Sequence, residues 1–82
     1  MRLYVENLPE ALDERELYCL FIVFGGITEV TICRDKNGKS LGSAYVDMPE
    51  MEQGKNAVRA LNEINFMNHF LRVWEIDHGF LQ

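Results

Sequence analysis

Apolar and polar residues alternate in four stretches of the chain, the pattern of strands whose side chains point in turn to opposite faces of a sheet. The predicted strands are residues 2–8, 27–34, 42–48 and 70–76. In the first strand, Leu3 and Val5 fall on one face and Tyr4 on the other. In the third, Tyr45 falls on the face opposite Ala44. Each of these two strands therefore buries aliphatic side chains and presents a tyrosine outward, and two such rings side by side form a surface for stacking.

Two other stretches have helical spacing. Residues 14–24 follow Asp13, a good helix N-cap, and Glu16 stands at the capping-box position three residues further on. A glycine pair that begins at Gly25 ends this helix. Residues 51–62 form the second helix. Its predicted inward face consists of Gly54, Ala57, Val58 and Leu61.

The predicted elements follow in the order strand, helix, strand, strand, helix, strand. Asn37 and Gly38 are a strong hairpin signal between the second and third strands, and residues 65–68 are predicted to be a loop. Two helices of this length cover only one face of a four-stranded sheet. The predicted fold is therefore α+β, a ferredoxin-like βαββαβ arrangement with the other face open. Residues 1–76 are predicted to form one domain and residues 77–82 a short tail.

Several segments, in order and at the right separations, resemble the RNA recognition motif family. Residues 3–8 (LYVENL) are similar to the hexamer of the family's first strand, and residues 41–48 (LGSAYVDM) to the octamer of its third. The other matches are Leu17, Leu20, Phe21, Phe24 and Gly25 in the first helix, Ala57, Ala60, Leu61 and Asn62 in the second, and Leu71, Arg72 and Val73 in the fourth strand. The resemblance implies an antiparallel sheet with the strand order 4-1-3-2.

The resemblance also implies a function, the binding of single-stranded RNA, with Tyr4 and Tyr45 each stacking one base. The octamer departs from the family pattern in three places. Leu41 replaces a Lys or Arg, so a phosphate contact is missing. Ser43, which remains in the predicted RNA site, stands where a further aromatic residue usually lies. Met48 replaces a terminal aromatic residue at a position that faces the core.

The net charge of −5 argues against a protein that grips nucleic acid mainly by counterion release, since such proteins are usually basic. The charge is nevertheless polarised, because most acidic residues belong to the helices and their flanking loops. The basic residues predicted to meet RNA are Arg2, Arg34, Lys36, Lys39 and Arg72. The acids that oppose them are Glu6, Glu29, Asp35 and Asp47. Trp74 is predicted to supply a third ring on the open face; the rival interpretation is that Phe80 and Leu81 of the tail fold back over it.

The first helix is apolar nearly all round, which indicates burial on more than one side. Its outward-facing apolar residues are Tyr18, Cys19, Ile22 and Val23. Such a patch often marks a partner surface, so the alternative function is protein binding or homodimer formation through this helix. The rival explanation is that neighbouring loops cover part of the patch.

Other function classes find little support in the sequence. Cys19 and Cys33 form neither a zinc motif nor a disulfide framework, and His69 and His78 are isolated. No nucleophile–base pair or phosphate-binding glycine loop is present, so neither an enzyme nor a cofactor is expected. The longest apolar run is too short for a bilayer, and no signal peptide is expected. The predicted location is intracellular, in the nucleus or the cytoplasm.

Overall fold

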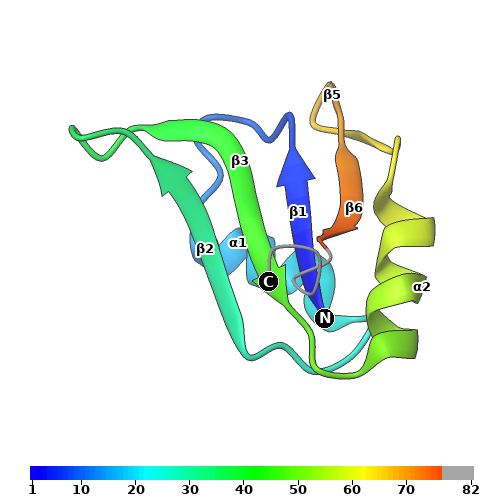
Figure 1. Ribbon diagram of the computed structural model, residues 1–82. Helices are drawn as coiled ribbons and strands as arrows, with labels where there is room; N and C mark the ends of the chain where they lie inside the picture. The colour runs from blue at the N-terminus through cyan, green and yellow to red at the C-terminus, as the bar shows by residue number, and fades with distance from the viewer. Residues whose placement is uncertain (77–82) are drawn as a thin grey trace.

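The computed structural model describes residues 1–76, which form a four-stranded sheet, two helices and a small hairpin (Figure 1). The elements are β1 (Arg2–Glu6), α1 (Glu14–Ile22), β2 (Glu29–Arg34), β3 (Ser40–Asp47), α2 (Met51–Leu61), β4 (Asn65–Phe66), β5 (His69–Phe70) and β6 (Arg72–Ile76). The predicted tail, with the proposed fold-back of Phe80 and Leu81, lies outside the described residues.

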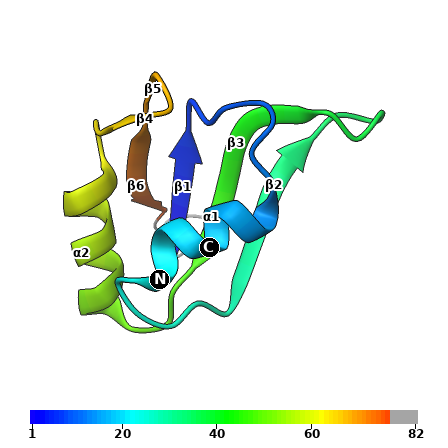
Figure 2. The same ribbon diagram turned by 180° about the vertical axis from the view of Figure 1, so that it is seen from behind.

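The strands of the large sheet lie in the order β2-β3-β1-β6, and every neighbouring pair is antiparallel. Since β6 is the predicted fourth strand, this is the expected order, and the predicted fold class is confirmed. Helix α1 lies behind the sheet, and α2 runs beside β6 (Figures 1 and 2). The Asn62 side chain at the end of α2 accepts a hydrogen bond from the Val73 amide (2.9 Å), which ties this helix to β6. Within residues 1–76, no helix lies on the opposite face of the sheet.

The core lies between the sheet and the helices, as the alternating pattern predicts. Leu3 and Val5 on β1 and Ala44 and Val46 on β3 are completely buried. The helices contribute Leu17, Phe21, Ala57 and Leu61 to the same core, and the adjoining segments contribute Leu8, Leu12, Met48 and Leu71. Burial of one large aliphatic side chain is worth about 1.5–3 kcal/mol, so the two β1 residues alone stabilise the fold substantially. Neither described helix is long and apolar enough to cross a membrane.

Helix α1 begins with the predicted capping box. The Glu16 amide donates to the Asp13 carboxylate (2.8 Å), and the Asp13 amide donates to the Glu16 carboxylate (3.0 Å). These bonds satisfy two amides that have no partner within the helix. The helix ends at Ile22, two residues earlier than predicted, because the chain turns toward Gly25.

The turn after α1 depends on the glycine pair. Gly25 has φ of +148°, a conformation that L side chains rarely adopt. The Gln53 side chain of α2 fills the space beside it, and its Oε1 accepts a hydrogen bond from the Gly26 amide (3.1 Å). The turn is thereby bonded to the second helix.

The β2–β3 hairpin turns at the predicted position. The Asp35 carboxylate accepts hydrogen bonds from the amides of Asn37 (2.8 Å) and Lys39 (3.0 Å), and Gly38 has φ of +85°. The Gly38 amide donates to the Asp35 carbonyl (2.9 Å), which closes the turn.

Residues 65–70 differ from the prediction of a loop followed by a strand from Phe70. Strands β4 and β5 form a separate hairpin, in which Phe66 pairs with His69. The two turn residues, Met67 and Asn68, have φ values of +52° and +67°, the backbone of a tight hairpin turn. Methionine is not a residue that signals such a turn, and for that reason the pattern of the sequence missed it.

We expect Gly25→Ala to lower the free energy of unfolding by about 1–3 kcal/mol, since the new methyl group meets Gln53 and the backbone is strained. Gly26→Ala is the matched control, because a Cβ at Gly26 meets nothing within 4 Å. Urea denaturation of both variants measures the difference. Equal destabilisation by the two substitutions would contradict this account of the turn.

Candidate functional site

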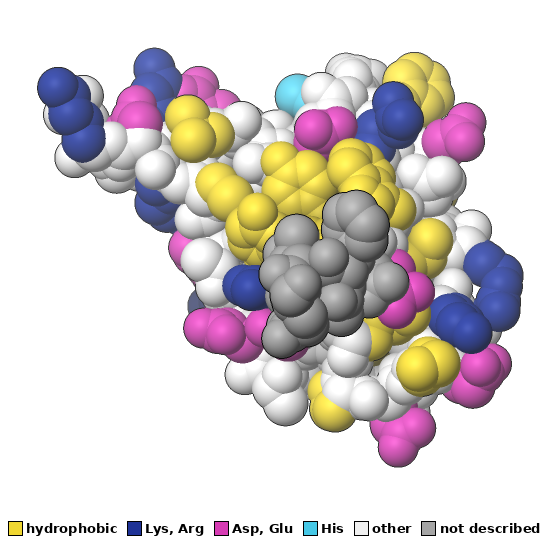
Figure 3. Space-filling model, in the orientation of Figure 1, with side chains coloured by type: hydrophobic (Ala, Val, Ile, Leu, Met, Phe, Trp, Pro, Cys, Tyr) yellow, Lys and Arg dark blue, Asp and Glu magenta, His cyan; other side chains and the backbone are white. Residues whose placement is uncertain are grey.

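Three aromatic rings lie in one row across the open face of the sheet. Tyr4 of β1 is the register partner of Tyr45 on β3 and of Trp74 on β6. The centroid of the Tyr4 ring lies 5.2 Å from that of Tyr45 and 5.1 Å from that of Trp74. We call these three rings the aromatic row. Figure 3 shows hydrophobic side chains gathered in one area of this face.

The aromatic row is accessible to a ligand. Trp74 is 40% exposed, and Tyr4 and Tyr45 are partly exposed, so each of the three residues has surface that a ligand can contact. Neighbouring ring planes are inclined by 49° and 68°, so a flat ligand lies on one ring at a time. The structure thus brings together the three rings that the sequence places on this face, and each is a separate stacking platform.

Arg2 lies on the face of one of these rings. Its guanidinium carbon is 4.4 Å from the centroid of the Tyr45 ring, a cation–π distance. The Asp47 carboxylate holds it there, with 3.3 Å between Arg2 Nε and Asp47 Oδ1. A ligand that takes this face of Tyr45 must therefore displace Arg2 or stack on the guanidinium.

A groove with a volume of about 800 Å³ adjoins the aromatic row at the end of β1. We call it the polar groove. Its lining includes Tyr4, Glu6, Leu41, Ser43, Phe70 and Arg72. Ser43 and Arg72 are the register partners of Glu6, so these three side chains form the next row of the open face beyond the aromatic row.

The β4–β5 hairpin forms one wall of the polar groove and is anchored by Asn7. The Asn7 side-chain amide donates to the Phe70 carbonyl (3.0 Å), and His69 Nδ1 donates to the Asn7 carbonyl (3.1 Å). His69 therefore fixes the groove wall. The sequence does not predict the groove, because the anchoring of this hairpin beside β1 depends on contacts between residues more than sixty positions apart.

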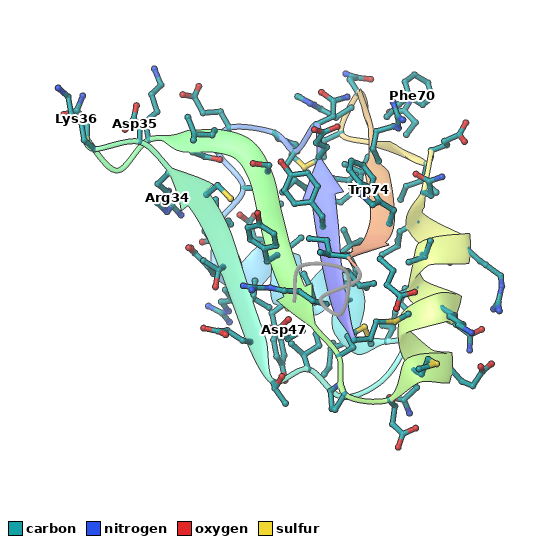
Figure 4. All side chains as sticks on the ribbon, viewed as in Figure 1. Arg34, Asp35, Lys36, Asp47, Phe70 and Trp74 are labelled. Atoms are coloured by element: carbon teal, nitrogen blue, oxygen red, sulfur yellow. The ribbon has the colours of Figure 1, made fainter. Side chains whose placement is uncertain are left out.

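The predicted basic residues of the β2–β3 hairpin do not reach the aromatic row. Arg34 turns toward the helix layer, where its Nη2 is 2.9 Å from the Glu14 carboxylate of α1. Lys39 pairs with Glu10 (3.2 Å), and Lys36 lies at the hairpin tip, far from Trp74 in Figure 4.

Only Arg2 and Arg72 of the five basic residues that the sequence places in the site lie beside the aromatic row. Glu6 and Asp47, which sequence reasoning treated only as opposing charges, lie on the same face. Electrostatic attraction at this face is therefore modest.

The outward face of α1 remains apolar and exposed. Tyr18, Ile22 and Val23 are 43%, 37% and 76% exposed, and Cys19 is exposed as well. We call these four residues the outer-face patch. Beside it, Tyr18, Ile27 and Val30 line a shallow groove of about 310 Å³ between α1 and β2. Within residues 1–76, no three His, Cys, Asp or Glu side chains are grouped as metal ligands.

Comparison with known proteins gives consistent matches. Residues 3–72 match the family model of the RNA recognition motif. Protein sex-lethal of Drosophila melanogaster is 40% identical over 72 residues, which are 87% of this chain and 20% of that protein. A splicing factor 3B subunit 6-like protein of Arabidopsis thaliana is 37% identical over 77 residues, covering 94% of this chain and 60% of its own length.

Solved structures agree with these matches. A complex of the Sex-lethal protein with RNA superposes with a TM-score of 0.88 at 38% identity, over 93% of this chain and 46% of that one. The chain spans about a fifth of the length of the first curated relatives it matches.

The Arg34–Glu14 pair predicts a pH dependence of stability. The hydrogen bond from Arg34 lowers the pKa of the Glu14 carboxyl from its ordinary value of 4.5. A carboxyl whose pKa is lower in the folded state stabilises the fold above pH 4.5 and loses that contribution as the pH falls through the lowered pKa. Because the Glu14 side chain is 44% exposed, water limits the effect to about 0.5 kcal/mol.

We expect Glu14→Gln to remove this part of the pH dependence in urea unfolding measured between neutral pH and pH values below the lowered pKa of Glu14. Glu63→Gln, at an exposed acid outside the ion pairs of residues 1–76, is the control and keeps it. An unchanged pH profile in Glu14→Gln would show that the pair contributes nothing.

Proposed function

The chain belongs to the RNA recognition motif family, and we propose that it binds single-stranded RNA by stacking bases on the aromatic row. The observation that carries this proposal is the row itself: three partly exposed rings, with neighbouring centroids 5.1 and 5.2 Å apart, on a sheet face that no helix of residues 1–76 covers. The similar Sex-lethal protein has been solved in complex with RNA, which supports the same ligand class here.

Stacking supplies most of the proposed affinity. Each base on an aromatic ring is worth about 1–3 kcal/mol. Phosphate contacts add less, because Arg2 and Arg72 are the basic residues beside the row and the net charge is −5. For single strands the salt dependence scales with the number of phosphates neutralised, so we expect it to be shallow.

Arg2 has a second role in this proposal. Its guanidinium occupies the Tyr45 face in the free protein, held by Asp47. When a base takes that face, the planar guanidinium can move outward and cover the base or meet a phosphate. Tyr4 carries no such cover among the described residues and is the first platform available.

We expect Tyr4→Ala and Tyr45→Ala each to weaken the binding of short single-stranded RNA by about 1–3 kcal/mol, because each removes one platform. Titration of a mixed-sequence pool of short RNAs, followed by fluorescence anisotropy, measures the affinity. Tyr18→Ala is the control, since this exposed tyrosine lies on α1, away from the open face. Wild-type affinity in the Tyr4→Ala, Tyr45→Ala double variant would overturn the proposal.

A second candidate function is protein binding or self-association through the outer-face patch. The observation that favours it is the exposure of four apolar residues on one side of α1, with an apolar groove beside them. Outward helix positions in a monomer are commonly polar, and a contiguous apolar patch marks contact surfaces.

Sedimentation of the concentrated protein tests this second function. We expect the wild type to self-associate or to retain a protein partner, and Ile22→Glu to abolish that association, because the substitution places a charge in the outer-face patch. Ala60→Glu, which adds the same charge to an exposed position of α2, is the control. A wild type that stays monomeric at high concentration and captures no protein would remove this candidate.

The RNA recognition motif is in general a binding domain, and we propose that this chain acts by binding alone. We also propose that it works in the nucleus or the cytoplasm. The names of its relatives, which include a splicing factor subunit and a polyadenylate-binding protein described as cytoplasmic and nuclear, support that location.

A further inference from the structure

We propose that Glu6 and Arg72, in the polar groove, read the edge of the base stacked on Tyr4 and select guanine. This inference rests on the proposed binding of RNA to the aromatic row and adds a base-specific subsite to it. Glu6 is not a stacking residue, and simple charge reasoning counts it against RNA binding.

The register places Glu6 where the edge of a stacked base would lie. Glu6 follows Tyr4 by two residues on β1, so both belong to the open face, about 7 Å apart along the strand. A purine that lies on the Tyr4 ring and extends along β1 therefore brings one edge to the Glu6 carboxylate. Both side chains line the polar groove, as this arrangement requires.

Within residues 1–76, the Glu6 carboxylate and the Arg72 guanidinium are not held in ion pairs, so both can bind a base. Three other acids near the open face or the hairpin are already paired: Asp47 with Arg2, Glu14 with Arg34 and Glu10 with Lys39. Among residues 1–76, neither Glu6 nor Arg72 takes part in an ion pair, although the two are register partners. An acceptor and a donor thus stand next to each other at the edge of the groove.

Ser43 makes room for polar recognition. It is the register partner of Glu6 on β3, and it stands at the position where the octamer pattern of the family has an aromatic residue. A small hydroxyl there leaves the Glu6 carboxylate uncovered by a ring. The loss of one stacking platform therefore opens a site for hydrogen bonding beside Tyr4.

The chemistry of a carboxylate favours one base. An ionised carboxylate only accepts hydrogen bonds, through two adjacent oxygens. Guanine alone among the four bases offers two adjacent donors on its Watson–Crick edge, N1–H and the N2 amino group. Adenine and cytosine offer one amino group beside an acceptor, and uracil offers one N–H between two acceptors. Arg72, which only donates, suits the O6 acceptor of the same guanine.

Single-base probes test the inference. The probes are short oligouridylates that carry one central guanosine, adenosine, cytidine or inosine. We expect the wild type to bind the guanosine probe about tenfold more tightly than the others, as is typical for a bidentate base contact. Inosine keeps N1–H but lacks the N2 amino group, so it should lose most of that preference.

Two variants separate base reading from simple charge. In Glu6→Gln an amide NH2 donor replaces one carboxylate oxygen, so the preference for guanosine should disappear. The affinity for an oligomer of uridine alone should stay the same or rise. Glu29→Gln removes an acid from the same face, in the row of Asp47, and should leave the preference intact. Neither residue belongs to the core, so both variants are expected to fold.

The outcomes distinguish the subsite from the general function. Equal affinity of the wild type for the guanosine, adenosine and cytidine probes would overturn the subsite, as would an undiminished preference in Glu6→Gln, and both results leave base stacking standing. If the wild type binds no probe better than the Tyr4→Ala, Tyr45→Ala double variant does, the proposed RNA binding fails together with the subsite.

Discussion

The register of β1 between β3 and β6 is the constraint on which the rest of the structure depends. It places Leu3 and Val5 in the core and Tyr4 on the open face. A slip of one residue would exchange the two faces. It would expose two fully buried aliphatic side chains, at a cost of about 3–6 kcal/mol. A small domain has little more total stability than that, so the core that fixes the register also fixes the site.

The ion pairs of residues 1–76 determine how much positive charge this acidic domain offers to an anionic ligand. Asp47, Glu10 and Glu14 each hold one basic side chain. Asp47 balances the charge of Arg2 on the face of the Tyr45 ring, whereas Glu14 and Glu10 keep Arg34 and Lys39 away from the aromatic row. Attraction of phosphates is therefore weak, and the ligand must gain its affinity from flat ring contacts and from the few polar groups beside them. Such a surface favours discrimination between bases over general adhesion to nucleic acid.

The sequence predicts those features of the site that depend on local periodicity. Alternation is enough to place Tyr4, Tyr45 and Trp74 on one face, and the capping residues are enough to place the start of α1. The sequence does not predict where long side chains go. Arg34 was expected among the RNA contacts, but Glu14 of α1 lies within its reach, and that proximity exists only once the helix has packed on the sheet.

The polar groove is a further feature that alternation could not reveal. Its wall is the β4–β5 hairpin, whose turn contains Met67 at positive φ, and Asn7 anchors that wall from the far end of the chain. Glu6 looked like an unfavourable charge because only the folded chain shows it between Ser43 and Arg72, free of an ion pair within residues 1–76.

The two candidate surfaces lie on opposite sides of one core. The aromatic row belongs to the open face of the sheet, and the outer-face patch belongs to the far side of α1, which lies behind that sheet (Figure 2). Occupation of one surface therefore does not block the other. A protein bound to the outer-face patch would therefore leave the aromatic row accessible. Such a partner would therefore act by positioning the domain on its RNA, and the choice of base would remain with the residues around Tyr4.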